Sequence, residues 1–255
     1  MIGIRRQITL VLATLLTLLM NYLSNALPLF GNSNGEISDL LPNAFTPAGL
    51  TFAIWGVIFL GLLAFAVYQA LPGQRGPRYD ALFWPYLLAN LLNVGWLVAF
   101  QSLHFGLSVV VMLALLGSLI WLYLRLKQLD LKGTEALALG LPTSLYLGWI
   151  AVATIANVTA WLVSLGFTAG LAGISGPLWS AILVVVASGV GAFLLRANRD
   201  FAVMGVILWA YYGVYLARPQ ELTVTLGLVL GVVVLLTAAF AQRGKPGSGA
   251  RRLSA

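Results

Sequence analysis

The Lys and Arg residues of this chain fall almost entirely into alternate gaps between its hydrophobic stretches. Of the 14 such residues, only Arg218 lies in an intervening gap. The others are Arg5, Arg6, Arg75, Arg78, Arg125, Lys127, Lys132, Arg196, Arg199, Arg243, Lys245, Arg251 and Arg252. Because loops rich in Lys and Arg stay in the cytoplasm during insertion, this pattern predicts an even number of membrane spans, with both chain ends cytoplasmic.

The hydrophobic stretches have the length of transmembrane helices. The 255-residue chain is 60% hydrophobic and only 8% charged, whereas a soluble domain is roughly a quarter charged. Crossing about 30 Å of hydrocarbon takes roughly 20 residues, and a backbone in lipid must satisfy its own hydrogen bonds. We therefore predict an all-α integral membrane protein of the cell membrane with eight spans, near residues 8–27, 48–71, 83–101, 105–124, 139–163, 177–195, 201–217 and 222–241.

Composition also limits the function. The net charge of +7 follows from the topology, so it does not indicate a nucleic-acid partner. The chain has no cysteine and one histidine, His104, which argues against thiolate or histidine-rich metal sites. No Asp, Glu, Lys, Arg or His side chain lies in the middle of a predicted span. This absence disfavours ion-coupled transport, which generally needs such residues in the membrane, and it leaves no catalytic residues to assign.

Two features divide the chain along its length. The Gly-rich stretch 166–176 separates five N-terminal spans (residues 1–165) from three C-terminal ones (166–242), and a basic, Gly/Ser-rich tail over 243–255 is expected to be disordered and cytoplasmic. A long external segment from Pro28 to Thr46 has the length of a functional loop. As an alternative, the first span could be a cleaved signal peptide, since Arg5 and Arg6 precede its apolar run and Ser24-Asn25-Ala26 at its end has the small-x-small pattern of a cleavage site.

Three spans carry aromatic and amide side chains on one face each. Helical spacing groups Phe52, Trp55 and Phe59, then Asn93 and Trp96, then Tyr146, Trp149, Ala153 and Asn157. At about 1.5 Å per residue, four of these lie roughly 8–12 Å below the outer surface. If the helices are neighbours, they enclose an aromatic cavity. Interface anchoring by Trp and interhelical hydrogen bonding by Asn are the competing interpretations.

These residues resemble the tryptophan-rich sensory protein/translocator protein (TspO/MBR) family. The family's second-helix signature is matched from Phe45-Thr-Pro47 through Phe52 and Trp55 to Phe59. Its third-helix motif matches Leu92-Asn93-Val-Gly-Trp96, and its fifth-helix motif matches Tyr146-Leu-Gly-Trp149, Ala153-Thr154 and Asn157. The resemblance covers about residues 1–165. Phe45 and Ala48 replace a family Trp and Pro, the first-loop tryptophans linked to porphyrin breakdown are missing, and the last three spans have no counterpart.

The resemblance implies a five-helix bundle that binds porphyrins and related hydrophobic ligands, here with a three-helix extension. A receptor, sensor or carrier for a tetrapyrrole or sterol-like molecule is the first hypothesis, with signalling as one role. The alternatives are a transporter that uses the extra helices, a porphyrin-modifying enzyme and a structural protein. No cofactor is required, although porphyrin or haem fits as a ligand. A homodimer is also implied, and Gly227 and Gly231 in the last span permit close helix contact.

The ligand hypothesis assigns a role to each residue. Trp55, Trp96 and Trp149 would stack on the ligand, and Asn93 and Asn157 would bind its polar edge. The expected ligand-binding residues are Phe45, Pro47, Phe52, Trp55, Phe59, Asn93, Trp96, Tyr146, Trp149, Ala153 and Asn157, with Phe45 and Pro47 at the rim and Trp149 at the floor.

Overall fold

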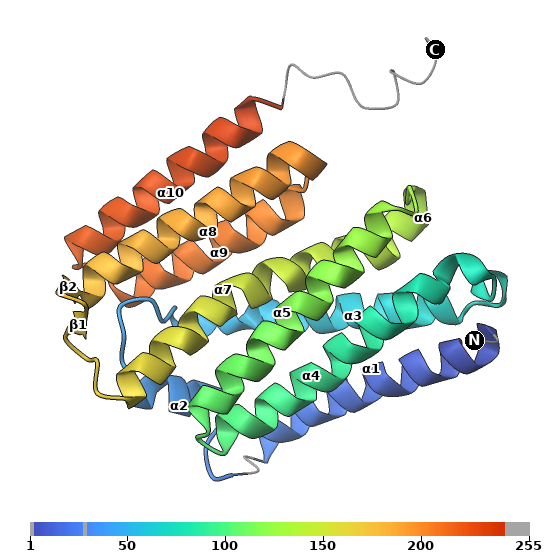
Figure 1. The fold of residues 1–255 in the computed structure, drawn as a ribbon, viewed down its shortest axis with the longest axis horizontal. Helices are drawn as coiled ribbons and strands as arrows, with labels where there is room; N and C mark the ends of the chain where they lie inside the picture. The colour runs from blue at the N-terminus through green and yellow to red at the C-terminus, as the bar shows by residue number, and fades with distance from the viewer. Residues whose placement is uncertain (1–2, 28–29, 243–255) are drawn as a thin grey trace.

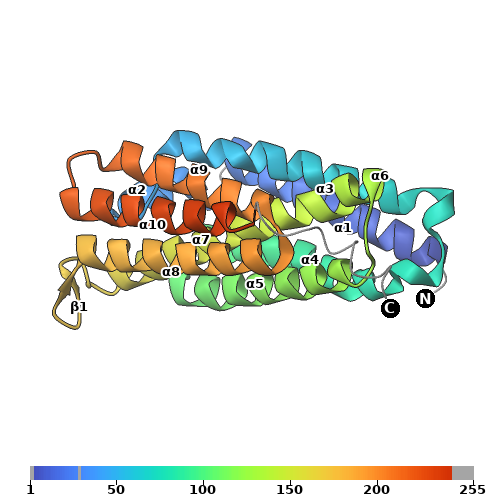
Figure 2. The same ribbon diagram turned by 90° about the horizontal axis from the view of Figure 1, so that it is seen from above.

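The chain folds into a bundle of long, roughly aligned helices (Figures 1 and 2). The computed structural model describes residues 3–27 and 30–242, so the tail predicted over 243–255 and part of the loop starting at Pro28 lie outside the described residues. The helices are α1 (Gly3–Ala26), α2 (Asn34–Leu40), α3 (Ile54–Ala70), α4 (Phe83–Gln101), α5 (Phe105–Lys127), α6 (Gly133–Glu135), α7 (Leu141–Ser164), α8 (Gly176–Asn198), α9 (Phe201–Ala217) and α10 (Leu222–Phe240).

Short elements fill the connections between these helices. The 3-10 turns are η1 (Gly49–Ala53), η2 (Pro72–Gln74) and η3 (Pro77–Leu82), and a π-helical segment, η4 (Ala136–Gly140), leads into α7. Two strands, β1 (Gly170–Leu171) and β2 (Ile174–Ser175), pair antiparallel between α7 and α8. This hairpin occupies the Gly-rich stretch, and its two turn residues, Ala172 and Gly173, have positive φ angles of 54° and 76°. In β1, Gly170 has a φ of 129°, and a Cβ there would lie 2.0 Å from the Ile174 carbonyl oxygen.

Seven helical segments of the described chain are long and apolar enough to cross a membrane. They begin at Gly3, Gly49, Pro77, Phe105, Gly133, Gly176 and Leu222. The remaining predicted span corresponds to α9, which has 17 residues and is therefore about 25 Å long. The multi-pass, all-α architecture is confirmed, whereas the count of eight remains a prediction because α9 is at the short limit for a span.

A ladder of hydrogen bonds joins α1 to α4 through the bundle interior. The Thr14 hydroxyl lies 2.8 Å from the Tyr86 hydroxyl, and Thr17 Oγ1 donates to the Asn90 carbonyl over 3.2 Å. Nearer the other end, Gln101 Nε2 donates to the Ser24 carbonyl over 2.9 Å. These polar groups recur at helical spacing on one face of α1, which makes α1 an integral part of the bundle.

Helices α8, α9 and α10 form a layer that docks on α7 through α9 (Figure 1). Gly213 in α9 allows the approach: its carbonyl accepts from Ala48 N over 2.9 Å, and a Cβ there would lie 1.9 Å from Thr51 Oγ1. Trp209 Nε1 adds a 2.8 Å bond to the Thr51 carbonyl. The C-terminal helices are therefore anchored directly to the segment that precedes α3.

The glycine pair in α10 packs within the chain. A Cβ at Gly227 would lie 2.7 Å from Ala181 Cβ, and one at Gly231 would lie 2.5 Å from Ser188 Oγ. Both contacts are with α8, so the close approach that the GxxxG spacing permits is made between α8 and α10.

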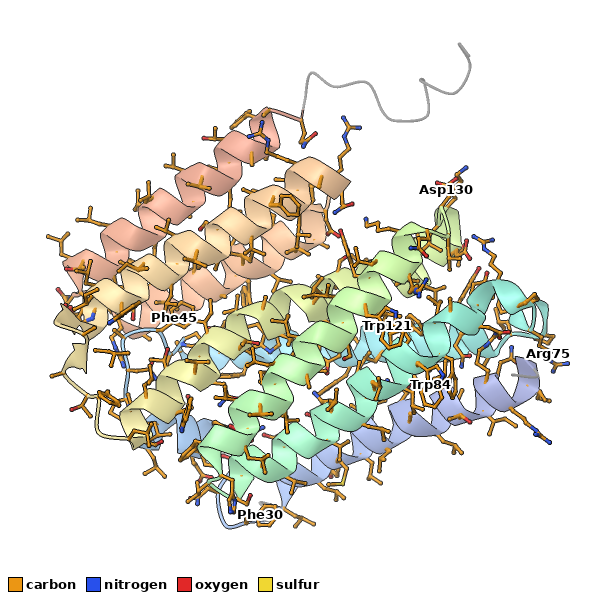
Figure 3. The ribbon with its side chains drawn as sticks, in the orientation of Figure 1. Phe30, Phe45, Arg75, Trp84, Trp121 and Asp130 are labelled. Carbon is orange, nitrogen blue, oxygen red and sulfur yellow. The ribbon has the colours of Figure 1, made fainter. Side chains whose placement is uncertain are left out.

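The basic connections gather at one end of the bundle. Arg6, which is 1% exposed, pairs with Asp80 over 2.5 Å, and Arg78 pairs with Glu135 over 3.0 Å. Figure 3 shows Arg75 at this end and Phe30 at the opposite end. This arrangement agrees with the alternate charge pattern, while the assignment of this end to the cytoplasm remains a prediction.

Candidate functional site: an aromatic cavity beneath α2

A small cavity lies between α3, α4 and α7 and is covered by α2. Its volume is about 70 Å³. The lining residues are Asn34, Ser38, Thr46, Pro47, Phe52, Trp55, Trp96, Phe100, Trp149, Val152, Ala153, Ala156, Asn157 and Ala160. Seven of the eleven residues expected from the sequence are in this lining: Pro47, Phe52, Trp55, Trp96, Trp149, Ala153 and Asn157. Their role in ligand binding remains a prediction.

Aromatic rings from η1, α3, α4 and α7 form much of the cavity wall. Trp149 meets Trp55 at 6.3 Å and 84°, and it meets Phe52 at 6.0 Å and 87°. Trp96 stacks on Phe100 at 5.3 Å and 22°. Edge-to-face and stacked pairs fix ring orientation beyond simple apolar burial. The wall is therefore a defined surface of π-faces and ring edges, suited to a flat apolar molecule.

Two buried polar atoms at this cavity have no hydrogen-bond partner in the described part of the chain. One is the indole nitrogen Nε1 of Trp149, a residue that is 2% exposed, and the other is Oδ1 of Asn34 in α2. A buried donor or acceptor without a partner costs about 1–3 kcal/mol. Both residues line the cavity, so a donor in its wall and an acceptor in its cover lie beside it without a protein partner.

The two amides of the motifs, Asn93 and Asn157, are hydrogen-bonded to other side chains of the protein. Asn93 Oδ1 accepts from Asn21 Nδ2 over 2.7 Å, and Asn93 Nδ2 donates to the Tyr146 hydroxyl over 2.8 Å. Asn157 Oδ1 accepts from Trp96 Nε1, and its Nδ2 donates to Ser108 Oγ, both over 2.8 Å. These bonds tie four helices together around the cavity, the arrangement expected of interhelical hydrogen bonds.

The four remaining expected residues lie behind the lining. Asn93 and Phe45 are both 0% exposed. Phe59 stacks on Trp55 at 5.3 Å, and Tyr146 meets the same ring edge-to-face at 5.9 Å. Phe59 and Tyr146 hold the Trp55 indole in place, and Asn93 in turn donates a hydrogen bond to the Tyr146 hydroxyl. None of the four residues is in the lining of the cavity.

Helix α2 was not foreseen from the sequence, although a local signal for it exists. Ser33 caps the helix: its hydroxyl accepts from Glu36 N over 3.3 Å, and Glu36 Oε2 accepts from Ser33 N over 2.7 Å. The Ser-x-x-Glu spacing is that of a capping box. The bond from the Ser33 backbone holds the pKa of Glu36 below its ordinary value of 4.5. Ile37, 0% exposed, fixes the helix over the bundle.

The site is equipped for binding. Its polar groups are indole, amide and hydroxyl, none of which has the acidity or basicity needed for proton transfer near neutral pH. Across residues 3–27 and 30–242, no group of three His, Cys, Asp or Glu side chains could hold a metal ion.

A comparison with protein families finds one match over most of the chain. The sequence model of a family described as "TSPO-like protein" matches residues 7–241. The match extends beyond the motif-bearing residues 1–165 and includes α8, α9 and α10. None of the curated proteins and none of the solved structures compared with the chain matches it.

Proposed function

The chain belongs to the TSPO-like family, as the match over residues 7–241 shows, and this confirms the family membership inferred from the three motifs. From this membership and from the geometry of the site, we propose that the protein binds a flat hydrophobic ligand in the cavity beneath α2. The ligand class is a tetrapyrrole or another flat apolar molecule with a polar edge, and the role is that of a receptor or carrier.

The unpartnered Trp149 indole carries this proposal. Trp149 lines the cavity together with Phe52 and Trp55, and its buried N–H has no acceptor in the described chain. A carbonyl or carboxylate on the edge of a stacked ligand would supply that acceptor. The unpartnered Asn34 Oδ1 would accept from a ligand N–H or O–H on the opposite side. Apolar walls with a few placed polar groups are characteristic of small-molecule sites.

The size of the cavity requires α2 to move when such a ligand enters. Ligand sites commonly have about 300–1,000 Å³, whereas this cavity has about 70 Å³. Asn34 and Ser38 of α2 line it directly. The helix has seven residues, and so short a helix depends on tertiary contacts for its stability. Displacing α2 would enlarge the cavity without disturbing the transmembrane helices, so α2 serves as a lid.

Replacing Trp149 with Phe tests the proposal, because it keeps an aromatic ring and removes the N–H. Binding of protoporphyrin, haem and a sterol to purified protein is measured by tryptophan-fluorescence quenching. We expect affinity for protoporphyrin to fall about fivefold, corresponding to about 1 kcal/mol for one hydrogen bond. Trp84→Phe, at an exposed position (60%), is the matched control and should leave affinity unchanged. Equal affinities for wild type and Trp149→Phe, or no binding by wild type, would refute the proposal.

A further inference from the structure

A second cavity lies on the opposite face of α7, between α7 and α8. Its volume is about 450 Å³, within the range of small-molecule sites. Along α7 it is lined by Thr154, Ile155, Val158, Thr159, Leu162 and Val163, none of which lines the cavity beneath α2. α7 contacts α9 much more extensively than it contacts α8. The space between α7 and α8 is therefore left open toward the end of the bundle that carries the β1–β2 hairpin.

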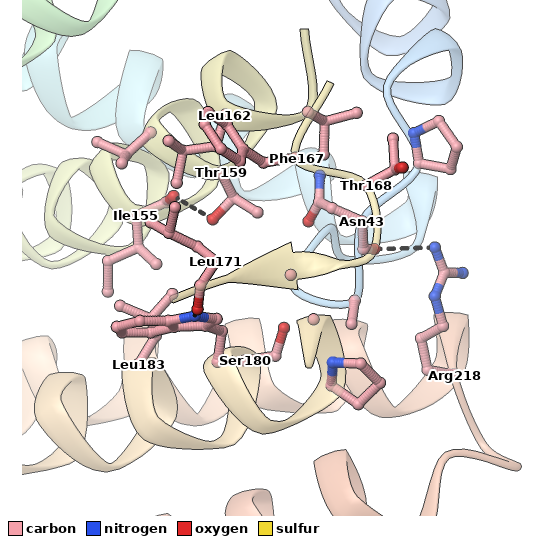
Figure 4. A pocket seen from close by; sticks show the side chains of 18 of the residues that line it. Asn43, Ile155, Thr159, Leu162, Phe167, Thr168, Leu171, Ser180, Leu183 and Arg218 are labelled. Atoms are coloured by element: carbon pink, nitrogen blue, oxygen red, sulfur yellow. Dashed lines mark hydrogen bonds between the residues drawn. The ribbon is translucent and has the colours of Figure 1, made fainter. Parts of the chain in front are cut away.

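The cavity has the depth of one membrane leaflet. It reaches along α7 from the helix end at Ser164 back to Thr154. Ten helical residues rise about 15 Å, which is half of the roughly 30 Å hydrocarbon thickness. Figure 4 shows the apolar side chains Ile155 and Leu183 at the end of the cavity far from Arg218. The Thr154 hydroxyl at this depth donates to the Ile150 carbonyl of its own helix over 2.7 Å. An acyl chain entering from the membrane surface would fit this shape.

The shallow end of the cavity carries a cation. Arg218 Nη2 donates to the Asn43 carbonyl over 2.9 Å (Figure 4). Its Nη1 donates to the Ala217 carbonyl over 3.0 Å. In the described chain its guanidinium has no carboxylate within 4.0 Å; the ion pairs there involve other residues. Glu221 also lines the rim but is exposed. A guanidinium has five N–H donors, so Arg218 retains donors for a ligand.

We propose that this cavity binds one acyl chain of a phosphate-bearing membrane lipid, with the phosphate at Arg218. The carbonyls of Asn43 and Ala217 orient the guanidinium, and its remaining N–H groups face an anionic head group at the membrane surface. Arg pairs well with phosphate because its fork of donors matches the phosphate oxygens. The hairpin closes the outer wall, since Trp179 Nε1 donates to the Leu171 carbonyl over 2.9 Å. This site is separate from the cavity of the proposed function and does not depend on it.

Native mass spectrometry of delipidated protein in detergent tests the proposal with three single-chain probes of equal chain length. Lysophosphatidylglycerol carries a phosphate, palmitate carries a carboxylate, and monopalmitoylglycerol carries no charge. We expect lysophosphatidylglycerol to bind most tightly. Arg218→Gln should weaken it at least about tenfold, as expected when charge-assisted hydrogen bonds are lost, and Arg218→Lys should restore part of the affinity. Arg196→Gln, at the exposed end of α8, is the charge control and should have no effect.

A second pair of variants tests the cavity without changing Arg218. Leu183→Trp would fill the deep end and should abolish lysophosphatidylglycerol binding, while Val186→Trp, at a 55% exposed position on the same helix, should not. Thermal unfolding of each variant checks that it is folded. Binding of monopalmitoylglycerol as tight as that of lysophosphatidylglycerol would overturn the role of Arg218. Tighter binding of palmitate would assign the site to free fatty acids and overturn the lipid assignment, and unimpaired binding by Leu183→Trp would overturn the location.

Discussion

Replacing Asn93 with Leu distinguishes a structural role for this amide from a ligand-binding role. Both polar atoms of Asn93 are used within the protein, by Asn21 at 2.7 Å and by Tyr146 at 2.8 Å. Interhelical hydrogen bonds in membranes contribute about 0.6 kcal/mol on average and up to about 1.7 kcal/mol. Losing two of them should lower the free energy of unfolding by about 1–3 kcal/mol.

Asn90→Leu is the matched control, because it is the same change on the same helix at a similarly buried position. The Asn90 amide makes its contacts within its own helix, where it donates to the carbonyl of Tyr86 over 2.9 Å, and its Oδ1 has no partner in the described chain. Removing an unpartnered buried acceptor can be neutral or stabilising. We therefore expect Asn90→Leu to change the free energy of unfolding by less than about 0.5 kcal/mol.

Unfolding by SDS in mixed micelles measures both free energies, and tryptophan quenching measures ligand affinity in the folded variants. If Asn93 is structural, Asn93→Leu should reduce affinity equally for ligands with and without carboxylate edges. Unchanged stability, together with a selective loss of affinity for carboxylate-bearing ligands, would refute this reasoning. It would then show that Asn93 turns toward the ligand when the cavity opens.

Two further changes probe the docking of α9 and the lid. Gly213→Ala should lower the free energy of unfolding by about 1–3 kcal/mol, seen as a lower midpoint of thermal unfolding, since the added Cβ collides with Thr51. Gly205→Ala is the control, because a Cβ there has no atom within 4 Å, and it should be neutral or slightly stabilising. Equal effects of the two changes would contradict the close contact at Gly213. The lowered pKa of Glu36 means that its bond to Ser33 stabilises α2 above pH 4.5 and is lost as the pH falls through the folded-state pKa. Amide-exchange protection of α2 should therefore fall as the pH drops below about 4.5 in wild type but not in Glu36→Gln, which keeps a capping partner without titrating. Parallel profiles would exclude Glu36 as the cause.

The transmembrane helices were predictable from the sequence because lipid imposes strong and simple requirements. Apolar runs of sufficient length define the segments, and alternate charged connections indicate how they are ordered. The layer shared by Trp96 and Asn157 was also predictable from helical rise, and the two side chains are 2.8 Å apart at their hydrogen bond. The length of α9, 17 residues, shows the limit of this method, since a short apolar helix meets the same pattern without having to cross the bilayer.

The details of the cavity depend on tertiary contacts that residue spacing does not specify. Spacing places Asn93 on the same face as Trp96, yet Asn21 on α1 and Tyr146 on α7 take up both of its polar atoms. The position of α2 depends on the burial of Ile37, which the sequence of a polar loop does not reveal. Similarly, the cavity between α7 and α8 exists because α9 packs on α7 in place of α8, and residue spacing does not specify which helix packs there.

Filling the cavity beneath α2 is the most direct test that it is the ligand site. Ala153→Phe would place a ring in the lining, whereas Ala151→Phe, on the same helix but outside that lining, provides the control. Protoporphyrin affinity is measured by quenching for both variants, with thermal unfolding to confirm that they are folded. Our account predicts at least about a tenfold loss of affinity for Ala153→Phe, equivalent to about 1.4 kcal/mol, and no loss for Ala151→Phe. Wild-type affinity in folded Ala153→Phe would contradict the assignment of the ligand to this cavity.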